Sequence, residues 1–272
     1  MKQYYYLVSS LYDLIIDNGR EQFAFDDFFD LCESELNSKD FRDFKMMFLF
    51  NDIKNSVGYK KQGDKFITPS FYSESEFLEN LKDTDSFLPF LSDFFYNKTS
   101  GKKNESPLSE IDNLTLLFYE DLDGTVTNSF IKDYYIFELN LKNINVAISL
   151  RKNGIDFKNK IIPYGDHFDF LLKNNSPDFG LVNEFTFIER LLSIYDKNHL
   201  IEIEKTIEEI RWDYLDSMCE GDTFGLVNIL SYAIKMVSVK RWLSLSKERG
   251  KELLNRLVKE IEGNIKFPNE FK

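Results

Sequence analysis

The chain has 272 residues, of which 43% are hydrophobic and 29% charged, and such a chain is long and apolar enough to bury a sizeable core. Its formal net charge of -12 and isoelectric point near 4.8 argue against binding to nucleic acid or anionic lipid, and suit a basic protein partner. With only 12 Gly and 6 Pro, the sequence lacks the many turn residues that a protein of short strands requires.

Apolar residues recur at helical spacing along most of the chain, and this pattern predicts an all-α fold. In chain order, the predicted helices span Phe25–Leu36, Phe41–Lys61, Glu74–Lys82, Ser86–Tyr96, Pro107–Glu120, a long segment from Thr127 to Asn153, Glu184–Tyr195, His199–Met218, Phe224–Leu245 and Lys247–Glu262. The intervening segments Tyr59–Tyr72 and Ile155–Asp178 show no clear helical pattern, so we expect loops or a small hairpin there.

The longest predicted helix has Thr127 as its N-cap and stops at Asn153-Gly154. Its apolar residues follow one another at steps of 4, 3, 4, 3 and 4 residues: Phe130, Tyr134, Phe137, Leu141, Ile144 and Ile148. The end of this segment, INVAISL, also alternates like a strand, so a strand over Ile144–Leu150 is the competing interpretation. The helical pattern continues through Leu141, and we therefore favour the helix.

Two segments of the sequence resemble each other without a gap at an offset of 88 residues. They are MMFLFNDIKN, from Met46 to Asn55, and YYIFELNLKN, from Tyr134 to Asn143. A weaker third copy, ILSYAIKMVSVKRWLSL, has Val239-Lys240 in the place of Ile53-Lys54. The sequence therefore predicts one helical domain over residues 1–272 that contains internal repeats.

The stretch LLFYEDLDGTVTNS, Leu116 to Ser129, matches the start of phosphotransferases of the haloacid dehalogenase type. In such an enzyme Asp121 would be the nucleophile and Asp123 the acid/base, with Mg²⁺ bound nearby. Ser149 and the acidic run Gly165 to Asp169 resemble the remaining motifs. A magnesium-dependent phosphatase is therefore one candidate function.

Spacing argues against the phosphatase, because only 16 residues separate Ser149 from Gly165, whereas each crossover of a parallel sheet needs ~30 residues. We therefore interpret the stretch around Asp121 and Asp123 as a solvated turn between two helices. In that turn Gly124 would take a left-handed conformation, and Thr125 or Thr127 would cap the next helix.

Other sites for chemistry have little support in the sequence. His167 and His199 are the only histidines, and the best remaining candidate for a metal is the group Asp166, His167 and Asp169. We interpret this group as ordinary loop polarity. The segment KTIEEIRWDY, Lys205 to Tyr214, is interpreted as a solvated charged face with an apolar seam. We therefore predict no enzyme and no catalytic, cofactor-binding or metal-binding residue.

The sequence also bears on the compartment. Cys32 and Cys219 lie far apart and form no metal-type pair, which fits a reducing environment. No run approaches the ~18 apolar residues of a membrane span, and the start, MKQYYYLVSSLY, lacks a signal-peptide pattern. We therefore expect a cytoplasmic protein that reaches a membrane only through a membrane-embedded partner.

Several segments, in this order along the chain, carry a resemblance to a known family: YYYLVSSL (Tyr4–Leu11), FNDIKN (Phe50–Asn55), FELNLKNINVAISLRKNG (Phe137–Gly154), DFGLVNEF (Asp178–Phe185), IEEIRWDYLD (Ile207–Asp216) and ILSYAIKMVSVKRWLSL (Ile229–Leu245). Together with the repeat, they resemble the stalk component of V-type and A-type rotary ATPases that is named C in prokaryotes and d in eukaryotes. The similarity is to a divergent bacterial branch encoded near such ATPases.

The resemblance implies an all-helical funnel of three lobes, which would cover roughly residues 1–96, 107–160 and 180–265. It also implies a non-enzymatic rotor adaptor without cofactors, whose partners are central-stalk subunits and the membrane ring of proteolipid subunits. The phosphatase is one alternative, and a generic helical scaffold or assembly factor is another.

Overall fold

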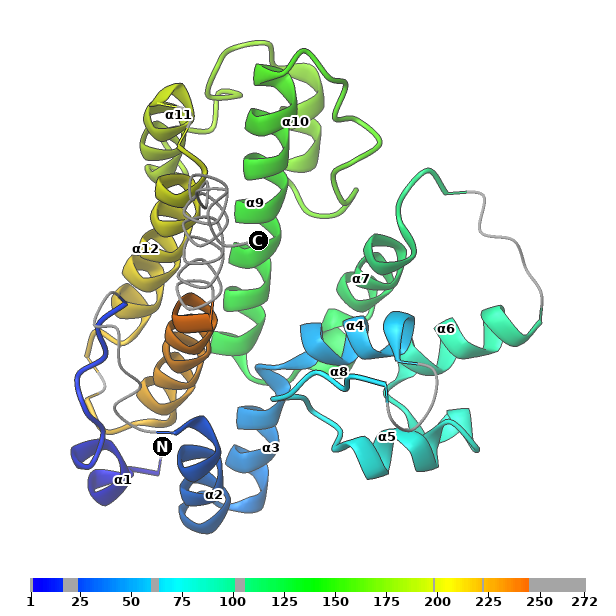
Figure 1. Ribbon diagram of the computed structural model, residues 1–272, viewed down its shortest axis with the longest axis vertical. Coiled ribbons are helices and arrows are strands. Elements are labelled where there is room, and N and C mark those ends of the chain that lie inside the picture. Colours follow the sequence, from blue (N-terminus) through cyan, green and yellow to red (C-terminus); the bar gives the residue numbers. More distant parts are fainter. Residues whose placement is uncertain are drawn as a thin grey trace, which may run out of the picture. The chain divides into compact units, whose positions relative to one another are not determined.

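The computed structural model describes residues 2–16, 24–59, 64–100, 106–197, 199–221 and 223–244 (Figure 1). Over these ranges the regular structure is helical and contains no strand, which confirms the predicted all-α fold. The described chain divides into two compact units, one from residues 1–36 and 222–272 and the other from Asn37–Gly221. Within the described ranges, no helix has the length and apolar character that crossing a bilayer requires.

The smaller unit joins the two ends of the sequence. It contains α1 (Tyr5–Ser9), α2 (Phe25–Glu35) and a helix over residues 226–244. The Tyr4 N–H donates to the Phe224 carbonyl oxygen over 2.8 Å, and the rings of Phe28 and Tyr232 meet edge to face at 5.2 Å. Cys32 is fully buried in this unit, and burial raises the pKa of its thiol.

The larger unit holds a longer series of helices. They are α3 (Ser38–Met46), α4 (Leu49–Gly58), α5 (Glu74–Asn80), η1 (Thr84–Ser86), α6 (Pro89–Thr99), α7 (Glu110–Glu120), α8 (Leu122–Thr125), α9 (Ser129–Lys152), α10 (Phe168–Lys173), α11 (Phe187–Lys197) and α12 (Leu200–Met218). Helices α4 and α6 pack against α7, whereas α11 packs against both α9 and α12. The long helix α9 runs between these two groups (Figure 1).

The segment Ile144–Leu150 lies within α9, so the predicted helix is confirmed and the competing strand is wrong. The helix ends as predicted: Gly154 has a φ of 68°, and the Ile155 N–H donates to the Leu150 carbonyl oxygen over 2.9 Å. The N-cap is Asn128 instead of the predicted Thr127. The Asn128 side chain donates to Asp43 over 2.9 Å and so bonds to α3 instead of to its own helix.

The predicted helix Phe41–Lys61 is interrupted in the structure. It consists of α3 and α4, which are separated by a turn at Met47-Phe48. Four consecutive residues around this turn, Met46 to Leu49, are all buried. A continuous helix turns by 100° per residue and cannot direct four consecutive side chains to one core. The break between the two helices allows all four apolar side chains to be buried.

Two helices, α6 and α7, begin about one turn later than predicted. Helix α6 begins at Pro89, whose missing N–H suits the first helical position, and α7 begins after Ser109, whose hydroxyl accepts from the Asp112 N–H. The short helices α1, α8 and α10 form where no helix was predicted. The predicted helix Lys247–Glu262 lies outside the described residues.

The internal repeat has a structural counterpart in two buried asparagines. Asn55 on α4 donates from Nδ2 to the Ile67 carbonyl oxygen (3.0 Å), and the Ile67 N–H donates back to its Oδ1 (2.9 Å). Asn143 on α9 forms the same pair of bonds with Ile162, both at 2.9 Å. Each asparagine therefore ties the following loop to its helix, and we call this pair of bonds the asparagine clamp.

Candidate functional site

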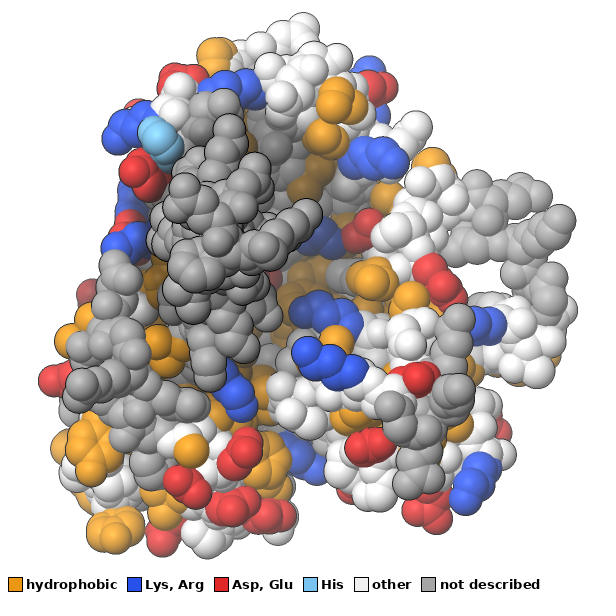
Figure 2. Space-filling view, in the orientation of Figure 1, with side chains coloured by type: hydrophobic (Ala, Val, Ile, Leu, Met, Phe, Trp, Pro, Cys, Tyr) orange, Lys and Arg blue, Asp and Glu red, His pale blue; other side chains and the backbone are white. Residues whose placement is uncertain are grey.

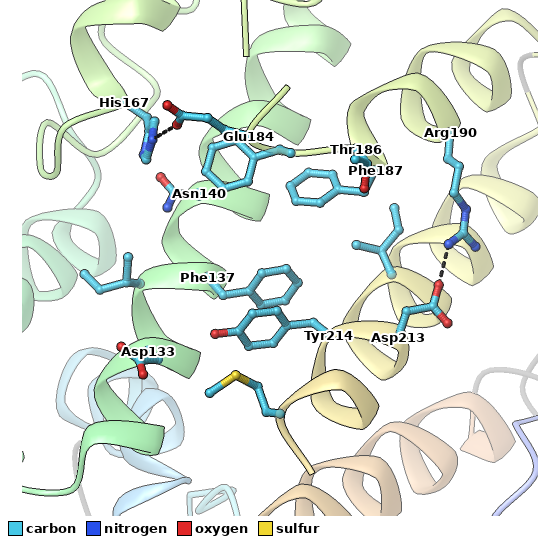
Figure 3. Close-up of a pocket in the computed structure, with 14 residues that line it drawn as sticks. Asp133, Phe137, Asn140, His167, Glu184, Thr186, Phe187, Arg190, Asp213 and Tyr214 are labelled. Carbon is cyan, nitrogen blue, oxygen red and sulfur yellow. Dashed lines mark hydrogen bonds and ion pairs between the residues drawn. The ribbon is translucent and has the colours of Figure 1, made fainter. Parts of the chain in front are cut away.

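The larger unit contains a pocket of about 720 Å³ between α9, α11, α12 and the segment that precedes α11 (Figure 3). The residues that line it are Asp133, Ile136, Phe137, Asn140, His167, Glu184, Phe185, Thr186, Phe187, Arg190, Ile210, Asp213, Tyr214 and Met218. A volume of this size suits a small molecule or a few side chains of a partner.

Aromatic rings form one wall of the pocket. Phe137 on α9 and Tyr214 on α12 are parallel, with ring centroids 3.8 Å apart, and Phe187 meets Phe137 edge to face at 6.0 Å. Burial raises the pKa of Tyr214 to about 12, and the charge of Asp133 acts in the same direction. The Tyr214 hydroxyl therefore stays protonated at neutral pH and can donate a hydrogen bond.

Charged side chains surround the aromatic wall. His167 forms a hydrogen bond with Glu184, and its ring lies edge-on to Phe185 at 4.7 Å. Arg190 on α11 donates to Asp213 over 2.5 Å and to Glu209 over 3.1 Å, which ties α11 to α12. Acidic and basic side chains both occur on the exposed edge that these two helices form at the left of Figure 2.

Asn140 stands out among the polar lining residues because it is only 7% exposed. Within the described part of the chain, its side-chain amide forms no hydrogen bond. Figure 3 shows this amide beneath His167 and Glu184, at the side of the pocket. The atoms of this amide remain accessible from the pocket, so the group is available to a ligand that brings a donor and an acceptor.

In the alignment of the two repeat copies, Asn140 corresponds to Asp52 of α4, which is fully buried. Asp52 has partners from its own chain: its two carboxylate oxygens accept from the backbone N–H groups of Phe71 (2.7 Å) and Tyr72 (3.1 Å). Burial raises the pKa of Asp52 to about 7, although these two bonds and the charge of Lys45 lower it.

The raised pKa of Asp52 predicts a pH dependence of stability. Because the folded-state pKa of about 7 exceeds the ordinary value of 3.8, the folded protein binds this proton more tightly, and the resulting stability is fully present below about pH 4. It is lost as the pH rises through about 7. We therefore expect the free energy of unfolding of the wild type, measured in urea, to fall relative to that of Asp52→Asn as the pH rises through this window. A wild type that gains stability relative to Asp52→Asn as the pH rises would contradict the raised pKa of Asp52.

A buried ion network joins two walls of the pocket. The Arg211 guanidinium on α12 binds both carboxylate oxygens of Glu138 on α9 and donates to Glu208 over 2.7 Å. The side chains of Arg211, Glu138 and Glu208 are 15%, 13% and 3% exposed. The prediction that Lys205 to Tyr214 is a solvated charged face is therefore wrong for these residues, since their charges pair with each other across two helices.

The carboxylates of the phosphatase hypothesis lie elsewhere, at α8. Asp121 accepts from the Thr125 hydroxyl over 2.5 Å, and Asp123, with its side chain 91% exposed, pairs with Lys132 over 2.6 Å. The connection between α7 and α9 is a short helix in which Gly124 has no positive φ. The predicted left-handed turn is therefore wrong, because the Asp121–Thr125 bond closes a helical turn instead.

The other predicted partners are not brought to those carboxylates on strands. Ser149 lies within α9, and the segment that contains Asp166 is an irregular loop. His167 lines the pocket, whereas Asp169 pairs with Lys173 over 2.5 Å. Across the described ranges, no group of three or more His, Cys, Asp or Glu side chains has a geometry that could hold a metal ion.

Sequence reasoning missed two features of this site. One is the ion network, whose members Glu138 and Arg211 are separated by 73 residues. The other is Asn140, for which the repeat held a signal: both aligned positions, Asp52 and Asn140, place a polar residue on a largely apolar helix face.

A family model described as "Protein of unknown function (DUF2764)" matches residues 1–265. No curated protein and no solved structure matches the chain.

Proposed function

This chain belongs to the DUF2764 family, and we propose that it is a non-enzymatic adaptor of the central stalk in a bacterial V/A-type rotary ATPase. In this proposal, the protein links the stalk to the membrane ring of proteolipid subunits and carries out no chemistry itself. It lies in the cytoplasm and is held at the membrane by these partners.

The repeated asparagine clamp is the observation that supports this proposal most. The resemblance to the ATPase stalk component depends on an internal repeat of helices that contain FNDIKN and FELNLKN, and Asn55 and Asn143 hold their loops in the same way. Chance similarity of two amphipathic helices does not require a shared loop attachment. The all-helical fold and the net charge of -12 also agree with an adaptor that meets basic partners.

The proposal is tested by isolating the rotary ATPase from the native organism through an affinity tag on one of its ATP-hydrolysing subunits. We expect this protein in the intact complex at a fixed ratio to the stalk subunits, as measured by quantitative mass spectrometry. An assembly factor would instead accompany partial complexes only. Absence from intact and partial complexes alike would rule out the adaptor and the assembly factor together.

A further inference from the structure

We propose that the pocket beside Asn140 binds an extended segment of a partner protein, and that this segment directs an arginine or lysine side chain toward Asp133. The proposal depends only on the pocket within the larger unit and not on the ATPase assignment. The chemistry required of the partner is a main-chain peptide group for Asn140 and a cation for the Asp133 carboxylate.

The first step is the match between Asn140 and a peptide group. An amide side chain offers one acceptor and a donor group, which complement the N–H and the C=O of a main chain. This chain already uses that match twice, because Asn55 and Asn143 each bind both groups of one isoleucine. Asn140 lies one helical turn before Asn143 and is 7% exposed, and it has no such partner within the described ranges.

The second step is the divergence of the two repeats beyond the clamp. In the first copy, the chain continues from Ile67 along α4, and its backbone reaches Asp52 at Phe71 and Tyr72. In the second copy, the chain turns sharply after Ile162: the Tyr164 N–H donates to the Ile162 carbonyl oxygen over 2.9 Å, and Gly165 follows with a φ of 84°. The main chain that fills this position in the first copy is therefore not supplied to Asn140 in the second.

The third step concerns charge. Asp133 is exposed and forms no salt bridge with any described residue, whereas Glu184 is already hydrogen-bonded to His167. The arginine in the pocket, Arg190, is already shared by Asp213 and Glu209. Asp133 thus offers negative charge to an incoming cation, which agrees with the acidic character of the whole chain.

The fourth step concerns the aromatic wall. Arginine and lysine side chains carry an apolar stem, which favours contact with aromatic rings, and a cation within about 6 Å of a ring centroid is attracted to the ring face. The stacked rings of Phe137 and Tyr214 lie between the α9 and α12 sides of the pocket (Figure 3). They provide a surface for the stem of the side chain that the Asp133 carboxylate attracts.

Nuclear magnetic resonance of the ¹⁵N-labelled full chain tests the proposal with three probes. The first is acetyl-alanyl-arginyl-alanine amide, the second is the same tripeptide with norleucine in place of arginine, and the third is methylguanidinium, which has no peptide group. We expect saturable shifts of the Asn140 side-chain amide with the arginine tripeptide, and binding weaker by about tenfold or more for the other two probes.

Two variants and one control complete the test. Asn140→Leu removes the amide and Asp133→Asn removes an exposed carboxylate, and each is expected to weaken binding of the arginine tripeptide by about tenfold. Glu189→Gln changes a carboxylate of α11 that does not line the pocket, and should leave binding unchanged. The proposal is overturned by equal binding of the norleucine tripeptide, by equal binding of methylguanidinium, which indicates a small-cation pocket, or by no saturable shift up to about 20 mM.

Discussion

Replacing Arg211 by methionine is expected to lower the free energy of unfolding by about 3–5 kcal/mol. Methionine keeps much of the length of the side chain but leaves Glu138 and Glu208 without the cation they share inside the larger unit. Removing one partner of a buried ion network costs more than the network contributes, because the remaining charges stay desolvated. Urea unfolding followed by circular dichroism measures the change.

Arg190→Met provides the matched control, since Arg190 also pairs with two carboxylates but at 44% side-chain exposure. Water screens this network, and its loss should cost about 1 kcal/mol or less. A second comparison adds Glu138→Gln and Glu208→Gln to Arg211→Met, and should restore much of the lost stability because no buried charge then remains unpaired. Similar losses for Arg211→Met and Arg190→Met would contradict the role of burial.

Helical periodicity predicted most helices because their apolar residues recur at steps of three and four. The pattern through Leu141 identified α9 over its whole length, and Asn153-Gly154 identified its end. Periodicity failed at Met47-Phe48, where four consecutive apolar residues are buried by a change in chain direction. A pattern that describes one straight helix contains no information about such a turn.

The candidate site was less predictable than the fold. Charges on α12 were interpreted as solvated because a helix pattern does not show which charged residue has a partner on another helix. Glu138 and Arg211 meet only after α9 and α12 pack together. The phosphatase motif shows the opposite error: Asp121 and Asp123 match a catalytic spacing, yet their positions at the start of α8 are set by local bonds to Thr125 and Lys132.

The repeat was visible in the sequence, and the structure supplies a physical reason for its asparagines. An asparagine on a buried helix face is unfavourable unless both ends of its amide are bonded. In the two copies, the backbone of Ile67 or Ile162 supplies both bonds. The weaker third copy has Arg241 at this position, so it cannot form a clamp of the same chemistry.

Asn143→Ala is expected to lower the free energy of unfolding by about 2–4 kcal/mol, since both backbone groups of Ile162 lose their partners. Asn55→Ala should cost less, because Ile162 is fully buried whereas Ile67 is partly exposed and can bind water after the substitution. Hydrogen exchange should report the loss locally, at the Ile162 amide in one variant and at the Ile67 amide in the other.

Asn153→Ala is the control for both clamp variants. Its exposed side chain forms one bond to the Ser149 carbonyl oxygen, and its removal should change stability by about 0.5 kcal/mol or less. If Asn55→Ala and Asn143→Ala each increased exchange throughout the larger unit, the clamps would be part of a single cooperative core. Exchange confined to the loop that follows each helix would instead indicate that every copy holds its own loop independently. The second outcome is the one the separate bonds predict, and it would explain how the loop after Ile162 could diverge and leave Asn140 facing a pocket while the clamp itself was retained.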